Sequence, residues 1–380
     1  MRIALITEAY TPIKNGVVHV VELSKNELQN RGHLVKVITP TNEKVHSNKN
    51  GIVDVPSIPL PGGSGYRLSF PRLSDAEKIL KKADIIHTHH PFVMGRWAQK
   101  LAEKYQKPFL FTNHTQYVNY MHHIPAVGGA LTEPVNNFVV KFANRCTVVI
   151  APALSTREQL IKDGVTAPIQ HVPNGIEVDR FGRGQGKLFR ERIGLDLRTP
   201  LLLYTGRIAP EKNLEFLIRA VASIKTRPQL ALVGGGPQLD ELRQLVRNLK
   251  AVDHIHLIGP LNYHQIPDAY AAANVFVTAS VTEVHPLVIL EAFAAHLPAV
   301  VIKARGTADI VEDGKTGLTT NKTRSDFTNA INKLLKDSNL RYRYGQNAHK
   351  VASSKYSIQA SVDTLLDTYR LAIKLKEKEA

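Results

Sequence analysis

The stretch "NVFVTASVTEVHPLVILEAFAAH", residues 274–296, contains a short apolar run, a polar loop and a second apolar run that begins at a proline. The first run, residues 274–280, is short, apolar and bounded by turn-forming residues, which is typical of a buried strand. Pro286 suits the first turn of a helix, and helix-forming residues follow it. The stretch therefore predicts a strand–loop–helix unit, with Glu283 at the strand end and Glu291 about a turn and a half into the helix.

This unit recurs along almost the whole chain. The runs "RIALIT", "LVKVITP", "ADIIHTHH", "KPFLFTNHT" and "TVVIAP" form a first set, and "PLLLYTG", "QLALVGGG", "HIHLIG", "NVFVTAS" and "PAVVI" form a second. Helical segments separate most of these strands, and a stretch rich in glycine and polar residues, 171–188, separates the sets. The alternation predicts an α/β protein with two parallel sheets, each covered by helices on both faces.

The predicted organisation has three parts. Residues 1–173 form one Rossmann-like domain and residues 174–357 form the second. Residues 358–380 form an amphipathic C-terminal helix that could pack back on the first domain. Ligands of open α/β sheets bind beyond the carboxyl ends of the strands, so the chemistry is expected in residues that follow strands.

Composition indicates a globular chain with an anionic partner. The 380 residues carry a formal net charge of +16 and have a pI of about 9.7. Both halves are basic, which argues against a single basic arm and for basic surfaces on two folded domains. We expect the partner to be a nucleotide or an anionic membrane, because the chain has no nucleic-acid motif and no series of stacking aromatic residues.

Other bulk features favour a cytoplasmic protein. No apolar run approaches the roughly 20 residues that span a bilayer. The N-terminal segment "MRIALITEAYTP" has neither a charged leader nor an apolar segment of useful length. Cys146 is the single cysteine, so no intramolecular disulfide is possible, and we expect a packed, inert thiol.

Three strand ends carry candidate phosphate-binding residues. Gly206, Arg207 and Lys212 follow the strand "PLLLYTG", where the two cations could grip a diphosphate. Gly234 and Gly235 follow the next strand and precede a helix, whose N-terminus favours an anion. The alternatives are two solvated surface cations and a glycine-rich turn with a structural role.

The third candidate is Gly16, which lies in the loop between the first strand and a helix, where backbone N–H groups could bind a phosphate.

The two glutamates of the opening stretch are candidates for binding hydroxyl groups. An ionised carboxylate accepts two hydroxyl hydrogen bonds, which is how proteins hold a ribose or a hexose. Alternatively, Glu283 caps the helix and Glu291 meets a buried arginine or lysine. The segment between them, with residues His285, Pro286, Leu287 and Val288, completes the predicted donor-binding set.

Histidines cluster at two strand ends. His87, His89 and His90 end one strand, and His114 follows another among polar residues. We expect the first three to be structural and single out His114 as a site residue, with a hydrogen-bonded structural histidine as the alternative. The chain has no HExxH and no Asp-x-Asp pair, so no metal site is predicted.

These motifs resemble the retaining glycosyltransferases of the GT-B fold, in family four of that classification. "GRIAPEKN", "VGGGP", "PNGIEVDRF" and "EVHPLVILE" carry the resemblance, which covers nearly the whole chain. It implies two Rossmann-like domains that face each other across a cleft. It also implies that Arg207 and Lys212 contact the nucleotide diphosphate, that Glu291 binds the ribose, and that Glu283 faces the donor sugar.

The resemblance assigns two residues of the first domain as well. The loop at Gly16 closes on the diphosphate, and His114 lies near the donor sugar and contributes to catalysis. The chain departs from the family at His296, where glycine is usual, and at His285–Pro286, where a smaller turn is frequent. The resemblance implies no cofactor and no metal, since the UDP-sugar is itself a substrate.

A narrower resemblance concerns the acceptor. "THHPFVMG", "NHTQYVNYMHHIP" and "PLPGGSGYRLSFP" are similar to segments of bacterial diacylglycerol glucosyltransferases. The last of these segments alternates apolar and basic residues beside glycines, which suits contact with an anionic membrane; a loop packed on its own domain is the alternative. The predicted membrane and acceptor residues are Tyr66, Arg67, Leu68, Phe70, Arg72 and Tyr117.

The predicted function is a retaining, metal-independent transfer of a hexose, with glucose favoured, from a UDP-sugar to diacylglycerol. The enzyme would act at the inner face of the cell membrane as a peripheral protein. Two alternatives share the fold: a UDP-sugar-dependent transferase with a soluble sugar acceptor, and a nucleotide-sugar epimerase.

Overall fold

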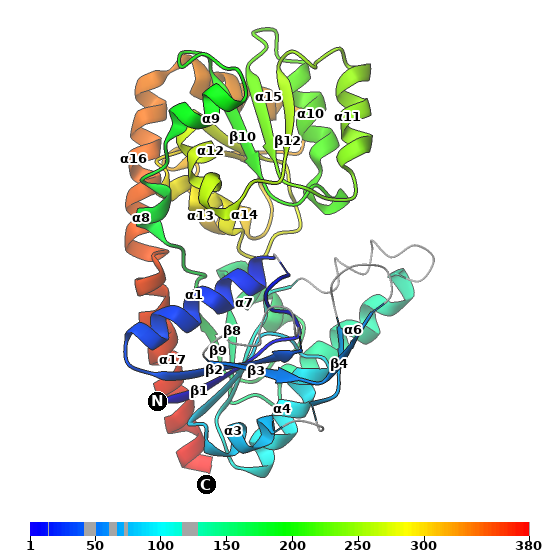
Figure 1. Ribbon diagram of the computed structural model, residues 1–380, viewed down its shortest axis with the longest axis vertical. Coiled ribbons are helices and arrows are strands. Elements are labelled where there is room, and N and C mark those ends of the chain that lie inside the picture. The colour runs from blue at the N-terminus through cyan, green and yellow to red at the C-terminus, as the bar shows by residue number, and fades with distance from the viewer. Residues whose placement is uncertain (14, 42–50, 61–66, 72–74, 116–127, 380) are drawn as a thin grey trace. The chain divides into compact units, whose positions relative to one another are not determined.

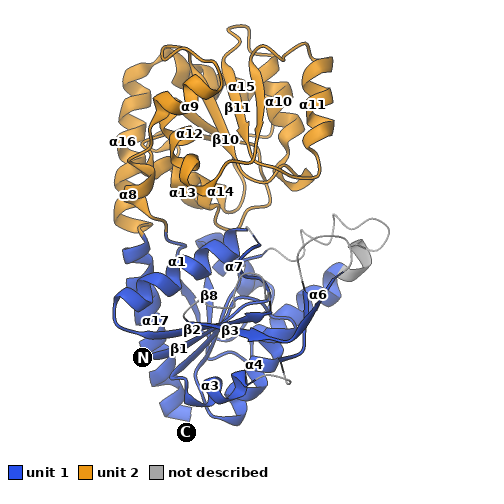
Figure 2. Cartoon of the chain, in the orientation of Figure 1, with its two compact units in different colours: residues 1–175, 358–380 blue, residues 176–357 orange. Residues whose placement is uncertain are grey.

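The computed structural model describes residues 1–379, except residue 14 and residues 42–50, 61–66, 72–74 and 116–127. The chain divides into two compact units (Figure 2). Unit 1 consists of residues 1–175 and 358–380, and unit 2 consists of residues 176–357. The chain passes from unit 1 to unit 2 after Gly175 and returns at Ile358.

Unit 1 is built around a parallel sheet in the order β3-β2-β1-β6-β7-β8-β9 (Figure 1). Its strands are β1 (Arg2–Ile6), β2 (Leu34–Pro40), β3 (Ile52–Val55), β6 (Ile85–Thr88), β7 (Phe109–Thr112), β8 (Val148–Ala151) and β9 (Ile169–His171). A separate antiparallel pair joins β4 (Ser57–Pro59) to β5 (Arg67–Ser69). The helices are α1 (Gly16–Asn30), α3 (Ala76–Lys82), α4 (Val93–Lys104), α6 (Gly128–Ala143), α7 (Leu154–Lys162) and α17 (Ile358–Glu379).

Unit 2 repeats this design with the parallel order β12-β11-β10-β13-β14-β15. Its strands are β10 (Leu201–Thr205), β11 (Gln229–Val233), β12 (Ile255–Gly259), β13 (Val275–Thr278), β14 (Ala299–Ile302) and β15 (Gly317–Thr320). Its α-helices are α8 (Val178–Phe181), α9 (Gly186–Arg192), α10 (Leu214–Ala222), α11 (Leu239–Asn248), α12 (Ile266–Ala272), α13 (Leu287–Ala294), α14 (Thr307–Ile310), α15 (Arg324–Lys336) and α16 (Ser338–Lys355). Two short 3₁₀ helices are η2 (Pro210–Lys212) and η3 (Tyr263–Gln265).

Both sheets are buried on both faces, as the apolar strands predict. In β10, Leu201 and Leu203 pack into one core cluster, whereas Leu202 and Tyr204 pack into the cluster on the opposite face. Successive side chains of a strand point to opposite faces, so an uninterrupted apolar run fills two layers at once. The predicted α/β class with two Rossmann-like domains is therefore confirmed.

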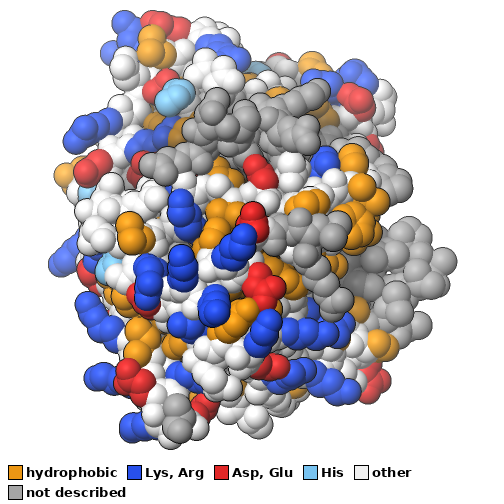
Figure 3. Space-filling view, turned by 60° about the horizontal axis from the view of Figure 1, so that its bottom comes forward, with side chains coloured by type: hydrophobic (Ala, Val, Ile, Leu, Met, Phe, Trp, Pro, Cys, Tyr) orange, Lys and Arg blue, Asp and Glu red, His pale blue; other side chains and the backbone are white. Residues whose placement is uncertain are grey.

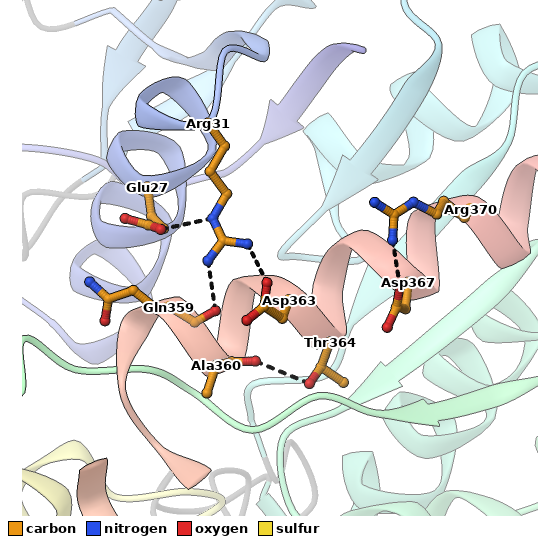
Figure 4. A network of polar contacts seen from close by, with 8 residues as sticks. All are labelled: Glu27, Arg31, Gln359, Ala360, Asp363, Thr364, Asp367 and Arg370. Atoms are coloured by element: carbon orange, nitrogen blue, oxygen red, sulfur yellow. Dashed lines mark hydrogen bonds and ion pairs between the residues drawn. The ribbon is translucent and has the colours of Figure 1, made fainter. Parts of the chain in front are cut away.

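Local signals set the ends of α1. The Asn15 side chain caps the helix by accepting a hydrogen bond from the Val18 backbone N–H at 2.8 Å. The helix is followed by Arg31 and then by Gly32, whose φ of 79° is the left-handed conformation expected of a glycine after a helix. Figure 4 shows how Arg31 then contacts α17: it donates hydrogen bonds to the Gln359 carbonyl and to Asp363.

Helix α17 belongs to the core of unit 1. Val362, Leu366 and Tyr369 are buried against residues of α1 and of the central strands. Where the chain returns to unit 1, a Cβ atom on Gly175 would lie 2.7 Å from the Ile358 Cα atom, so only glycine fits this crossing.

Candidate functional site

In unit 2, the predicted donor residues lie beyond the two strands at which the strand order reverses. β10 pairs with β11 on one side and with β13 on the other. Arg207 follows β10 and is exposed, while Glu283 lies in the loop after β13. The point of reversal is where open α/β sheets bind ligands, so the fold brings these two strand ends to one edge of the sheet.

Glycines allow the loops after β10 and β11 to touch through their backbones. The Gly206 N–H donates a hydrogen bond to the Val233 carbonyl at 3.0 Å. A Cβ atom on Gly234, which has φ of 146°, would lie only 1.8 Å from the Gly206 carbonyl oxygen. Gly235 is different, because a Cβ atom there would make only ordinary contacts with Pro260, at 3.7 Å. Gly234 thus has a structural reason to be glycine, and Gly235 has no steric one.

Lys212 and Glu283 form an ion pair. Lys212 ends the 3₁₀ helix η2, and its Nζ atom is 2.6 Å from Glu283 Oε1. The two side chains are only 21% and 17% exposed, so water screens the pair weakly. A Cβ atom on Gly306, with φ of 79°, would lie 2.4 Å from the Glu283 carbonyl oxygen. The loop at Gly306 therefore supports the loop that carries Glu283.

Glu291 lies on α13 and accepts a hydrogen bond from the Tyr270 hydroxyl at 2.7 Å. Burial raises the pKa of Glu291 to about 7, and this hydrogen bond and the charge of Arg180 partly oppose the effect. The alternative that Glu291 meets a buried arginine or lysine differs from this arrangement, since its hydrogen-bond partner in the described structure is a tyrosine. Thr205, at the end of β10, is 2.5 Å from the same hydroxyl.

The segment between the glutamates forms the entry to α13. His285 is buried and its ring lies edge-on to Tyr356, with the ring centroids 5.4 Å apart. Pro286 occupies the capping position, one residue before the helical turn in which it was expected. Leu287 and Val288 begin the helix, and both are partly buried. The Tyr270 hydroxyl also lies 3.2 Å from the Val288 carbonyl oxygen.

In unit 1, His87 and His89 are buried, and the partly buried His114 continues the same group. His87 Nδ1 is 2.9 Å from the Tyr369 hydroxyl of α17, and its Nε2 is 2.7 Å from Thr112 Oγ1. His89 Nδ1 is 2.9 Å from His114 Nε2, and the two rings stack. Burial lowers the pKa of His87 to about 3 and the pKa values of His89 and His114 well below the ordinary value. These imidazoles are therefore neutral at physiological pH.

Unit 1 contains an acidic residue that the sequence interpretation missed. Glu8 follows β1, directly beside the position where the strand order of this sheet reverses. It accepts a hydrogen bond from the Met94 N–H at the start of α4, at 2.7 Å. Burial raises its pKa to about 7. The sequence contains a signal for Glu8, because it is a lone acidic residue directly after the first apolar run, in "ALITEAY".

Gly16 is exposed and is the first residue of α1, directly after the capping Asn15. Two further findings concern the described residues as a whole. There, no group of three or more His, Cys, Asp and Glu side chains could hold a metal ion. Nor does any helix of that part combine the length and hydropathy that a membrane crossing requires.

The predicted membrane segment is only partly described. Tyr66, Arg72 and Tyr117 lie outside the described residues. Arg67–Ser69 is strand β5 rather than a loop, and the Arg67 guanidinium donates hydrogen bonds to Ser57 Oγ and to the Ser57 carbonyl of β4, at 2.8 and 3.0 Å. Arg67 therefore binds its own hairpin. Leu68 and Phe70 remain 38% and 39% exposed.

An apolar groove with a basic edge lies beside this hairpin, on the surface of unit 1. It has a volume of about 980 Å³. Its apolar walls include Phe70, Phe92, which caps the N-terminus of α4, and Trp97 of α4. Arg96 and Lys100, one helical turn apart on α4, also line it and are exposed. Figure 3 shows Lys and Arg side chains with hydrophobic side chains among them on the visible face of the molecule.

Known proteins match this chain over most of its length. Residues 14–180 match the family described as Glycosyltransferase Family 4, and residues 187–351 match Glycosyl transferases group 1. The alpha-monoglucosyldiacylglycerol synthase of Acholeplasma laidlawii is 30% identical over 342 residues, which are 85% of this chain and 85% of that protein. The protein of the same name from Streptococcus pneumoniae is 31% identical over 313 residues, 79% of this chain and 70% of that protein.

The chain belongs to the family 4 glycosyltransferases. Solved structures agree on its fold. Anabaena Alr3699/HepE in complex with UDP has a TM-score of 0.80 at 18% identity, covering 97% of this chain and 99% of that chain. Sucrose-phosphate synthase from Thermosynechococcus elongatus has a TM-score of 0.78 at 21% identity, covering 97% and 98%. The predicted family and GT-B fold are confirmed, and the predicted enzyme class is confirmed as a glycosyltransferase.

Proposed function

We propose that this glycosyltransferase moves a hexose, with glucose the first candidate, from a UDP-sugar to the hydroxyl group of diacylglycerol and retains the anomeric configuration. The observation that carries the proposal is the group of Arg207, Lys212, Glu283 and Glu291 at the reversal point of the unit 2 sheet. The names of the two relatives above support the donor sugar and the acceptor, and the solved neighbour with UDP supports the nucleotide.

The donor half of the mechanism follows from the charges in unit 2. Arg207 is exposed and can bind diphosphate oxygens through its planar fork, and Lys212 adds a second positive charge. Both would stabilise the charge that develops on the UDP leaving group as the glycosidic bond breaks. The proposal assigns this neutralisation to the two side chains and requires no metal. Glu291, once ionised, accepts hydrogen bonds from the ribose hydroxyl groups.

Retention is assigned to front-face attack. In this mechanism the sugar passes through an oxocarbenium-like state, and the leaving phosphate accepts the proton of the attacking acceptor hydroxyl. The proposal assigns Glu283 and His114 to hydroxyl groups of the donor sugar, with Glu283 as an acceptor of hydrogen bonds. The neutral state of His114 suits contact with an uncharged sugar.

The acceptor half is assigned to unit 1. A diacylglycerol molecule has two acyl chains and one hydroxyl group, so its binding site needs apolar surface next to the membrane. The groove between α4 and the β4–β5 hairpin offers apolar side chains such as Trp97 and Phe70, and Arg96 and Lys100 add attraction to anionic lipids. The proposal therefore places the enzyme peripherally at the inner face of the cell membrane.

UDP release tests the proposed reaction. We expect release from UDP-glucose to increase strongly when liposomes contain diacylglycerol, and a glycolipid to appear as product. EDTA should leave the rate unchanged. Slow release that lipid does not affect would refute the lipid acceptor and favour a soluble sugar acceptor. Conversion of one UDP-sugar into another without release of UDP would instead identify an epimerase.

Arg207→Ala tests the donor site. Loss of a charge that stabilises the transition state should lower turnover by about a hundredfold or more. The matched control is Arg219→Ala, which removes an arginine from α10 of the same unit, where its partner is Glu215 on the same helix face. Near-normal transfer by the Arg207 variant would contradict the assignment.

Paired substitutions test the groove. Each basic residue near an anionic surface contributes about 1 kcal/mol, so Arg96→Ala with Lys100→Ala should weaken binding to anionic vesicles by about 2 kcal/mol, or roughly thirtyfold. Vesicles of zwitterionic lipid should bind the variant and the parent equally. The control variant replaces Arg243 and Arg247 of α11 in unit 2. Equal losses in both double variants would refute a membrane role for the groove.

A further inference from the structure

The pairing of His89 with His114 requires one proton between the two rings. His89 Nδ1 and His114 Nε2 are 2.9 Å apart, a hydrogen-bond distance that needs one donor and one acceptor. Burial keeps both imidazoles neutral, so each ring carries a single N–H. The pair therefore has two possible arrangements, and these differ in which nitrogen of His114 is protonated.

In the first arrangement, His89 Nδ1–H donates to His114 Nε2, and the proton of His114 is on its Nδ1 atom. In the second, His114 Nε2–H donates to His89 Nδ1, and the proton of His89 is on its Nε2 atom. The first leaves His89 Nε2 as a bare lone pair, whereas the second makes it a buried N–H group that needs an acceptor.

The surroundings of His89 Nε2 distinguish the two arrangements. This atom has less than 1 Å² of accessible surface and no hydrogen-bond partner among the described residues. A cavity of about 20 Å³ lies beside the two histidines. Because His89 Nε2 has so little accessible surface, a water molecule in that cavity could not reach this atom. A buried N–H group without an acceptor is rarer in folded proteins than an under-satisfied acceptor. The first arrangement is therefore favoured.

Neighbouring residues hold the His89 ring in place. The His89 backbone N–H donates to the Ile6 carbonyl at 2.9 Å, which continues the pairing of β6 with β1. Its ring lies against that of His87, with the centroids 4.4 Å apart. His87 in turn contacts Tyr369 of α17 and Thr112 of β7. The orientation of His89 is thus held by β1 and, through His87 of β6, by α17 and β7, and His89 can in turn fix the neighbouring ring.

We propose that His89 is a positioning residue that holds His114 in the Nδ1–H form. His114 then presents a neutral hydrogen-bond donor, and its Nε2 lone pair is occupied by His89. If the proposed function holds, the group that binds the Nδ1–H is an oxygen of the donor sugar, and His114 does not act as a base through Nε2. This part of the inference rests on the proposed function, whereas the tautomer assignment does not.

Nitrogen NMR of the full chain with labelled histidines tests the tautomer. The signals of His114 are identified by their loss in His114→Gln. We expect the wild-type spectrum to show the proton of His114 on Nδ1. His89→Asn should preserve this form, because an asparagine amide N–H can replace the Nδ1 donor, whereas His89→Ala should release the ring into the other tautomer. In the control His90→Asn, His114 should stay unchanged.

A proton on Nε2 of His114 in the wild type would overturn the proposal, and so would an unchanged His114 signal in His89→Ala. If the alanine variant does not fold, the spectra of the wild type and of His89→Asn still show which nitrogen of His114 carries the proton. In kinetics we expect His89→Ala to lower kcat about tenfold or more with little change in the donor KM, and His89→Asn to restore it. An Nδ1 proton without any sugar transfer would refute the proposed function alone.

Discussion

Tyr270→Phe tests whether the protonation state of Glu291 controls nucleotide binding. The Tyr270 hydroxyl is fully buried on α12 and lies 2.7 Å from Glu291 Oε2 and 2.5 Å from Thr205 Oγ1. Phenylalanine keeps the ring, which packs edge-on against Phe181, but removes the donor. The substitution therefore changes one hydrogen bond to the carboxylate with little change in volume.

The size of the effect follows from that hydrogen bond. A hydrogen bond to a charged group contributes about 1.5–3 kcal/mol, which equals roughly one to two pKa units. The pKa of Glu291 is about 7, and the tyrosine lowers it, so its removal raises the pKa further. At pH 7 the ionised fraction then falls from about one half to between about a tenth and a hundredth. If ribose binding needs the ionised form, the affinity for UDP at pH 7 falls between about fivefold and fiftyfold.

Calorimetric titration with UDP from pH 6 to pH 9.5 measures this effect. The parent enzyme should bind more tightly as the pH rises through about 7, and the Tyr270 variant should show the same rise at a higher pH. The UDP affinities of the parent and the variant should converge near pH 9.5, where Glu291 is ionised in both proteins. Tyr344→Phe, at a buried tyrosine of α16, controls for loss of a hydroxyl group. Equal UDP affinities of parent and variant at pH 7 would refute this reasoning.

Two further predictions concern the stability of the two units. Burial lowers the pKa values of His87 and His90 to about 3 and 4 in the folded protein, so the unfolded chain, with a histidine pKa near 6.5, takes up protons first as the pH falls. The folded state therefore keeps its full stability above pH 6.5, and at pH 5.5 each histidine lowers the free energy of unfolding of unit 1 by about 1.4 kcal/mol. Urea unfolding from pH 8 to pH 5 measures this loss, and a constant midpoint would contradict it. Gly306→Ala should destabilise unit 2 by about 2 kcal/mol or more, because the φ of Gly306 is 79° and a Cβ atom there would meet the Glu283 carbonyl. The control Gly235→Ala should change the free energy of unfolding by no more than about 0.5 kcal/mol. Equal urea midpoints for the two variants would contradict this account.

The sequence is sufficient to predict the fold because its signals are local. The strand "PLLLYTG" is apolar on both faces, and this alone indicates a sheet covered on both sides. The end of α1 has a local signal too, since Gly32 follows the helix with a φ of 79°. The β4–β5 hairpin was missed because its strands are three residues each, and Arg67 was wrongly assigned to a loop. A three-residue strand has no periodicity to detect, since its pairing partner defines it.

The candidate site could be predicted in part. Most candidate residues that follow strands were found, because the carboxyl ends of parallel strands meet at one edge, although Glu8 after β1 was not. Their partners were not. Tyr270 is 21 positions from Glu291, and His89 is 25 positions from His114, so neither contact leaves a local pattern. The groove was also missed, since only the packed structure brings Phe92, the residue before α4, beside Phe138 of α6, with their ring centroids 6.2 Å apart.

Near pH 7 the negative charge of Glu283 and Glu291 is partly offset, and this has a consequence for the proposed reaction. Lys212 neutralises Glu283, and burial leaves Glu291 half protonated near pH 7. The exposed Arg207 then dominates the local charge and favours an incoming diphosphate. If a diphosphate binds there, it would attract Lys212, so that Glu283 would lose its cationic partner and become a stronger acceptor for sugar hydroxyl groups. Under the proposed function, nucleotide binding would thereby prepare the sugar site, and this couples recognition of the two halves of the donor.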